Sequence, residues 1–208
     1  KKSKKKVVTS KITTTVQTTT TQQVSIANET AVSTTSSGTS VSQATAAASS
    51  SQNQSKYEAN VASVAGKMDN RVIAAYQQLG FKLVVDPSVN YSGYFDARSR
   101  SITMKQIDDS VYHELGHFLA FIAGNADKTA SFQSIFAAEK ANVTAFNKAY
   151  VTQNASEYFA ESVKDYILNN ASLKSSRPQT YAAVQNALNQ ITDAQIAKIQ
   201  KIYGAFWN

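Results

Sequence analysis

The sequence has no cysteine, and its 208 residues include only two prolines, two histidines and one tryptophan. The absence of cysteine excludes disulfide bonds, cysteine-ligated zinc and thiol catalysis. No apolar run approaches the length that a transmembrane helix needs, so we expect no transmembrane segment. A site that uses imidazole must be built from the two histidines.

Aromatic residues are also absent from residues 1–56, and every Tyr, Phe and Trp lies from Tyr57 onward. Residues 9–55 are mostly Thr, Ser, Gln and Ala, which cannot bury enough apolar surface to offset chain entropy. We therefore predict a disordered tail at 1–55 and one folded domain at 56–208. A stalk through a cell wall and a plain linker or pro-segment both remain open for the tail.

Positive charge is concentrated in the same tail. The formal net charge is +7, yet residues 1–55 hold six lysines and a single acidic residue. The lysines at the start would suit an anionic wall polymer, a membrane surface or a nucleic acid, or would form the basic end of an export signal. Residues 56–208 show no basic stripe, so we expect no nucleic-acid partner.

Both histidines lie in one pentapeptide, His113-Glu114-Leu115-Gly116-His117. In this H-E-x-x-H pattern the two imidazoles share a helical face and can ligate one zinc ion, while Glu114 can activate a zinc-bound water. The flanking residues are apolar and predict a buried helix, in which histidines need partners such as a metal. The alternative is a surface helix with two ordinary histidines and a solvated glutamate.

A third zinc ligand must be a carboxylate. Catalytic zinc usually takes three protein ligands, and the chain offers no third histidine. Glu157 and Glu161 share one face of a predicted apolar helix, where buried carboxylates are costly unless they are paired or metal-bound. We predict that Glu157 ligates the metal and that Glu161 accepts a hydrogen bond from an imidazole N–H. The alternative places one glutamate in solvent, paired with a lysine.

These residues carry a resemblance to a known family. H-E-L-G-H at 113–117, S-E-Y-F-A-E-S at 156–162 and P-Q-T-Y at 178–181 are similar to the metalloprotease domain of anthrax lethal factor and its small secreted relatives. Those relatives include the Pro-Pro endopeptidases. The similarity extends in order and spacing over residues 57–190.

The resemblance implies a zincin-like (gluzincin) metalloprotease domain at 56–208 with one catalytic Zn²⁺. It implies that His113, His117 and Glu157 hold the zinc and that Glu114 is the general base. It also implies a catalytic tyrosine seven residues before the ligand glutamate, which is Tyr150, as donor to the developing oxyanion. Without the resemblance Tyr150 would be one of ten tyrosines, most of which pack against the fold.

Hydrophobic periodicity and capping signals predict a helix-rich α+β fold with a small β-sheet. Helices are expected at 57–79, 109–123, 130–140, 156–169, 178–189 and 192–203. Strands are expected at 81–85 and 101–104, and residues 89–95 are expected to form turns. By position and by resemblance, an edge strand is predicted to bind an extended peptide substrate through Ser101, Ile102, Thr103 and Met104.

The sequence thus predicts a secreted zinc endopeptidase that acts as a monomer on protein or peptide substrates. Relatives that cut between prolines carry a tryptophan in the loop corresponding to 86–100, and this chain has none there, so cleavage of proline-rich substrates stays open. The lack of cysteine and the Ser/Thr-rich tail are typical of a Gram-positive bacterial protein that is extracellular or attached to the cell wall. The alternative function is a cell-surface or wall-binding module with a vestigial peptidase fold.

Overall fold

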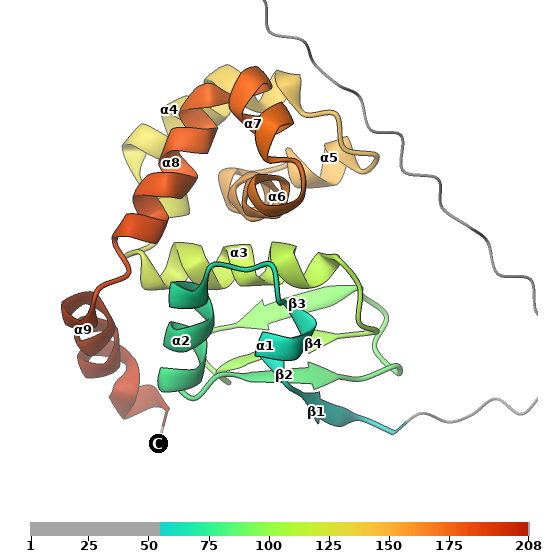
Figure 1. Ribbon diagram of the computed structural model, residues 1–208, viewed down its shortest axis with the longest axis vertical. Helices are drawn as coiled ribbons and strands as arrows, with labels where there is room; N and C mark the ends of the chain where they lie inside the picture. Colours follow the sequence, from blue (N-terminus) through green and yellow to red (C-terminus); the bar gives the residue numbers. More distant parts are fainter. Residues whose placement is uncertain (1–54, 208) are drawn as a thin grey trace, which may run out of the picture. The chain divides into compact units, whose positions relative to one another are not determined.

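The computed structural model describes residues 55–207, in which a small sheet and several helices form layers around one central helix (Figure 1). The expected helix-rich α+β class is confirmed. The predicted disordered tail lies, apart from residue 55, outside the described residues and stays a prediction. Within 55–207 we find no helix whose length and hydropathy would let it span a membrane.

The sheet has the strand order β1-β2-β4-β3. Its strands are β1 (Tyr57–Ala59), β2 (Lys82–Val85), β3 (Gly93–Asp96) and β4 (Ser101–Met104). β4 pairs in parallel with β2 and antiparallel with β3, so both sides of its backbone are already bonded. The prediction that 101–104 is an edge strand is therefore wrong. The edge strands are β1 and β3, and β3 lies largely in the segment expected to form turns.

The single helix expected over 57–79 is also wrong. Residues 57–59 pair with β2 instead, and two helices follow, α1 (Val61–Val64) and α2 (Asn70–Gln78). Each starts at a polar cap: Asn60 accepts from the backbone N–H groups of residues 62 and 63, and Asp69 accepts from that of residue 71. Two helix starts so close together interrupt a continuous helix, although the apolar spacing suits one.

The central helix α3 (Ser110–Ile122) lies between the sheet and α6 (Ala155–Leu168) (Figure 1). A Cβ added at Gly116 would lie 2.7 Å from both the Cα and the carbonyl oxygen of Ala160. Only glycine allows the two helices to approach this closely. α3 ends where Gly124 and Asn125 adopt left-handed φ values of 77° and 60°, as the sequence indicated.

The remaining helices cover the outer side of α6 and one end of the sheet (Figure 1). Glu139 accepts hydrogen bonds at the start of α8 from the backbone N–H groups of Gln179 and Thr180, at 3.0 and 2.9 Å. Thr192 caps α9, accepting from the backbone N–H of Gln195. The outer elements are η1 (Ala126–Lys128), α4 (Ala130–Glu139), η2 (Lys140–Asn142), α5 (Lys148–Val151), α7 (Asn170–Ser176), α8 (Pro178–Asn189), α9 (Asp193–Tyr203) and η3 (Gly204–Phe206).

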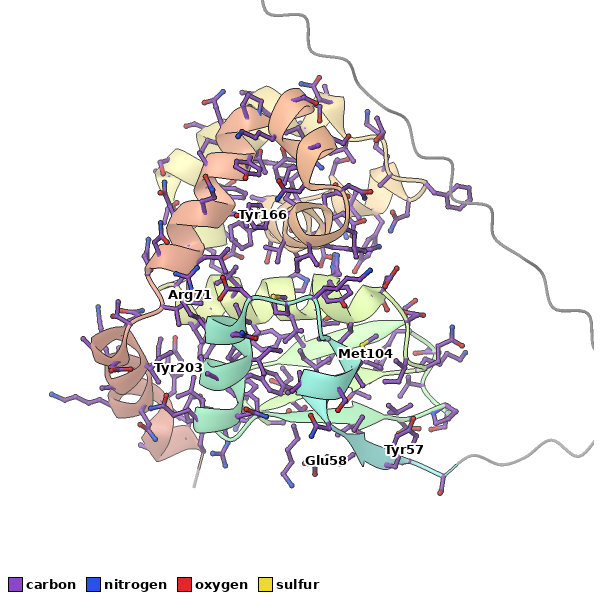
Figure 2. All side chains as sticks on the ribbon, in the orientation of Figure 1. Tyr57, Glu58, Arg71, Met104, Tyr166 and Tyr203 are labelled. Atoms are coloured by element: carbon purple, nitrogen blue, oxygen red, sulfur yellow. The ribbon has the colours of Figure 1, made fainter. Side chains whose placement is uncertain are left out.

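Side chains of α2, α3 and the sheet fill the space between these elements, with Met104 and Leu115 fully buried (Figure 2). Trp207 packs edge-on against Phe81, with ring centroids 5.9 Å apart, and its indole N–H donates to the Ala97 carbonyl at 2.8 Å. The one tryptophan is therefore a packing residue of this core. Helix α3 therefore rests on a tightly packed base.

Candidate active site

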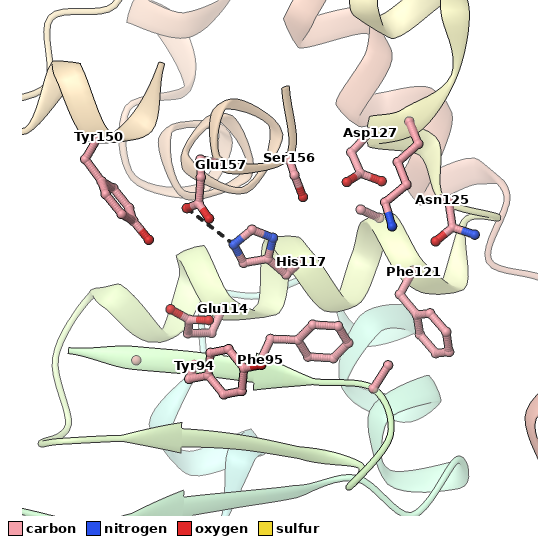
Figure 3. Close-up of a pocket in the computed structure, with 14 residues that line it drawn as sticks. Tyr94, Phe95, Glu114, His117, Phe121, Asn125, Asp127, Tyr150, Ser156 and Glu157 are labelled. Atoms are coloured by element: carbon pink, nitrogen blue, oxygen red, sulfur yellow. Dashed lines mark ion pairs between the residues drawn. The ribbon is translucent and has the colours of Figure 1, made fainter. Parts of the chain in front are cut away.

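Three side chains from two helices converge on one point. Nε2 of His113 lies 3.1 Å from Oε2 of Glu157, and Nε2 of His117 lies 3.6 Å from the same oxygen. One ligand atom from each of the three residues lies within 4.8 Å of the other two. Figure 3 shows Glu157 descending from α6 toward His117 on α3. These residues are the three predicted metal ligands, and they form a cluster that could hold a metal ion.

The local sequence of α6 fixes the position of Glu157. Asn154 caps the helix by accepting a hydrogen bond from the Glu157 backbone N–H at 2.9 Å, which places Glu157 in the first turn. The close contact of Gly116 with Ala160 then sets how near α6 lies to α3. The cap and the glycine together bring a carboxylate over two imidazoles that lie 44 and 40 residues earlier in the chain.

Glu161 lies behind His113. Its Oε2 is 2.9 Å from Nδ1 of His113, and its Oε1 is 3.4 Å from Nζ of Lys164. A carboxylate on Nδ1 leaves Nε2 free to act as a ligand and holds the ring in place. Burial would raise the pKa of Glu161, but the hydrogen bond from His113 and the charge of Lys164 hold it below its usual value.

The charges of the cluster compensate one another. Burial opposes protonation of His113, yet the carboxylates of Glu157 and Glu161 outweigh it and raise the His113 pKa to about 9. Burial likewise acts to raise the pKa of Glu157, while the two imidazoles hold it well below its usual range. Two imidazole nitrogens and one carboxylate oxygen are a donor set that catalytic zinc takes, with a fourth position left open. His113, His117 and Glu157 therefore offer the donor atoms that suit Zn²⁺, the ion that the sequence predicted.

Glu114 lies beside the cluster without joining it. Its side chain is buried, and burial raises its pKa above the usual value against the opposing charges of His113 and His117. The edge strand passes directly against it: a Cβ added at Gly93 would lie only 2.6 Å from Oε1 of Glu114. Gly93, which sequence reasoning did not single out, thus lets β3 approach this carboxylate.

Tyr150 projects from α5, and its hydroxyl points into the cavity toward Glu157 (Figure 3). Partial burial and the negative charge of Glu157 raise the pKa of Tyr150 to about 12. The hydroxyl therefore keeps its proton near neutral pH and can donate a hydrogen bond. Tyr150 thus lies in the wall of the cavity that also contains Glu114 and Glu157.

Two cavities flank these groups along β3. One, of about 310 Å³, extends past His117 to Asn125, Asp127 and Ser156. The other, of about 340 Å³, extends past His113 to Tyr91, Asn147 and Lys164. Gly93, Glu114 and Tyr150 belong to the walls of both cavities.

The four residues expected to bind substrate are not among the lining residues of either cavity. Ser101, Ile102, Thr103 and Met104 lie one strand further in, and Ile102 and Met104 are fully buried. Strand order depends on long-range pairing, so the local pattern could not distinguish β4 from β3. Cavity residues that sequence reasoning did not assign to the site include Gly93, Asn125, Asp127, Lys128 and Ser156.

Residues 96–187 match the family model described as anthrax toxin lethal factor, N- and C-terminal domain. The resemblance to lethal factor is confirmed over this stretch. It contains both helices of the cluster and every candidate catalytic and metal-binding residue, as well as β4 and most of α8. Strands β1 and β2 and helix α9 lie outside it.

A curated relative, the Pro-Pro endopeptidase of Clostridioides difficile (strain 630), is 41% identical over 78 residues. The aligned stretch covers 36% of this chain and 34% of the relative, so it spans about a third of the relative's own length. It supports a common ancestry for the matched region.

Proposed function

We propose that residues 56–208 form a zinc-dependent endopeptidase domain of zincin-like (gluzincin) fold that hydrolyses protein or peptide substrates. The convergence of Nε2 of His113, Nε2 of His117 and a Glu157 oxygen carries this proposal. The match to the lethal factor family and the similarity to a relative named Pro-Pro endopeptidase support it.

His113, His117 and Glu157 would hold one Zn²⁺, and Glu161 would fix the ring of His113. When bound, the ion would supply Lewis-acid chemistry, polarising the scissile carbonyl and making water more acidic. The rigid packing of α3 against the sheet and α6 keeps both imidazoles oriented for it.

Glu114 acts as the general base. It takes a proton from the attacking water and transfers it to the amine of the departing peptide. Its burial beside Gly93 makes the carboxylate more basic than in water, as the raised pKa indicates. A more basic carboxylate accepts this proton more readily, while it can still release it in the second step.

Tyr150 supplies a hydrogen bond to the substrate from α5, whereas Glu114 acts from α3. Its pKa of about 12 keeps the hydroxyl protonated, so it donates to the oxyanion that develops on the scissile carbonyl. Because the ring is half-exposed on the short helix α5, it can adjust to a bound peptide.

The free edge of β3, in place of residues 101–104, would pair with an extended peptide. Both cavities lie along this strand, so side chains on either side of the scissile bond have a place to bind. We further propose that the protein acts as a monomer outside a bacterial cell, and that residues 1–55 serve as a disordered tail.

Cleavage profiling by mass spectrometry tests this function. A diverse peptide library, with proline-rich members because of the relative's name, is incubated with the zinc-loaded wild type and with Glu114→Gln. Cuts made by the wild type and reduced about 10²- to 10⁴-fold in the variant are expected, because a general base contributes that much. If neither protein cuts any peptide although zinc is bound, the peptidase proposal is rejected in favour of a wall-binding module.

A further inference from the structure

Asp127 is a buried acid in the wall of the active-site cavity. Only 3% of the residue is exposed, and it lines the same cavity as Glu114, His117 and Tyr150. Figure 3 shows its carboxylate on the far side of His117 from Tyr150, directed into the cavity beside Ser156. The catalytic groups described above do not use it.

The Asp127 carboxylate has no partner among residues 55–207. Within these residues it accepts no hydrogen bond, and no cationic side-chain nitrogen lies within 4.0 Å of it. This also holds for Nζ of the neighbouring Lys128. Among residues 55–207, two side-chain polar atoms have neither a hydrogen-bond partner nor contact with solvent. They are the Tyr76 hydroxyl and Nε of Arg177. Because the Asp127 oxygens are not among them, they keep contact with the cavity.

The backbone around Asp127 is held in place. Asn125 adopts a left-handed conformation with φ of 60°, and Gln133 donates from Nε2 to the Asp127 carbonyl at 3.3 Å. Thr129 donates to the Ala126 carbonyl at 3.0 Å and caps α4. The carboxylate is thus pre-positioned, so a ligand would not have to order the loop on binding.

The carboxylate has no protein partner and reaches the cavity, so a cation that enters the cavity can pair with it. Such a pair is stronger in a cavity wall than at the open surface, because less water screens it. The other charged residues of the cavity wall are Glu114 and Glu157, which are acidic, and Lys128, which is exposed. The cavity of about 310 Å³ is large enough for one long side chain. The size of the cavity admits a long side chain, and the negative charge of Asp127 favours a basic one over an acidic one.

We propose that Asp127 is a specificity-determining residue that binds a cationic group of the substrate, the side chain of a lysine or arginine on one side of the scissile bond. This inference rests on the proposed peptidase function, because it assigns a subsite of the same cleft. The pairing is a charge-assisted hydrogen bond to a fixed carboxylate.

The test uses acetylated and amidated octapeptides in which Lys, Arg, Met, Gln or Glu occupies each position in turn. The full chain, its Asp127→Asn variant and an Asp193→Asn control are compared by kcat/KM. Asp193 is an exposed residue in the first turn of α9 and carries the same charge. At one position Lys or Arg should exceed Met and Gln by about 10- to 100-fold, a preference lost in Asp127→Asn alone.

Peptide binding to Glu114→Gln, with and without Asp127→Asn, gives a second readout that needs no turnover. A preference for Lys or Arg in binding, without cleavage by the wild type, would retain the Asp127 subsite and reject the peptidase function. Equal binding of Lys, Met and Gln peptides would overturn the subsite whether or not cleavage occurs. An equal loss of affinity for all peptides in Asp127→Asn would also overturn it, since Asp127 would then support the fold or the position of His117. The same octapeptides with a free amino terminus are measured beside the acetylated set. If only these bind, the cationic group is the α-amine and the assignment to a side chain is wrong.

Discussion

The two helices that build the site differ in how they are buried. In α3 eleven of thirteen residues are buried, because the sheet lies on one side and α6 on the other. In α6 only seven of fourteen are buried, and Glu157 lies at the cavity wall. The two helices therefore contribute differently: α3 holds His113, His117 and Glu114 between two layers, whereas α6 brings Glu157 to them at the cavity wall and Glu161 behind His113.

The strongest test of this division compares the two carboxylates of α6. Glu157→Gln should remove zinc binding at stoichiometric concentrations, because a ligand is lost. Glu161→Gln should weaken zinc affinity by about 10- to 100-fold, the usual effect of losing a residue that orients a ligand. Isothermal titration of zinc into chelator-treated protein measures both, and equal affinities for the two variants would contradict the assigned roles.

A smaller effect is expected at Tyr150, which belongs to neither helix. Tyr150→Phe should lower kcat by about 100-fold, as for the loss of one oxyanion donor, with zinc affinity unchanged. Steady-state kinetics on a peptide identified by the profiling measures the loss. Normal turnover in the variant would exclude Tyr150 from the mechanism.

The contact between α3 and α6 can be broken directly. Gly116→Ala places a Cβ 2.7 Å from the Ala160 backbone, so it should lower the free energy of unfolding by about 3 kcal/mol or more and weaken zinc binding. Gly66→Ala is the matched control, because its Cβ would meet only the Ala62 carbonyl oxygen at 3.7 Å. Denaturant unfolding of both variants measures the effect. Similar free energies of unfolding for the two variants would show that α3 and α6 can move apart without destabilising the protein.

The smallest effect is expected in the outer layer that covers α6. Glu139→Gln removes a buried charge that accepts from Gln179 and Thr180 at the start of α8, including the Thr180 hydroxyl at 2.7 Å. We expect the free energy of unfolding to fall by about 1–2 kcal/mol, with turnover unchanged. Parallel unfolding and activity assays test this, and a large loss of turnover would mean that α8 positions α6.

The cluster of His113, His117 and Glu157 was predictable from the sequence because each part of it is encoded locally. Histidines four residues apart on one apolar helix and two glutamates four apart on another define two faces, and the resemblance joined them. The same local signals predicted β2, α3, α4, α6, α8 and α9 within a few residues of the observed ends. These elements depend on periodicity and caps within one segment.

The rest could not be predicted because it depends on long-range packing. Residues 57–59 have the spacing of a helix, and only their pairing with β2 makes them a strand. The strand order, which puts β3 and not β4 at an edge, likewise depends on contacts between distant segments. No local pattern reveals that Gly93 lies against Glu114 or that Asp127 points into the cavity.

The central claim is that α3 and α6 hold one zinc ion between them. Anomalous X-ray diffraction from crystals of the zinc-loaded full chain, recorded on both sides of the zinc absorption edge, tests it directly. The account predicts one strong zinc-specific peak within bonding distance of Nε2 of His113, Nε2 of His117 and the Glu157 carboxylate. Zinc-specific peaks elsewhere, with none at this position, would contradict it.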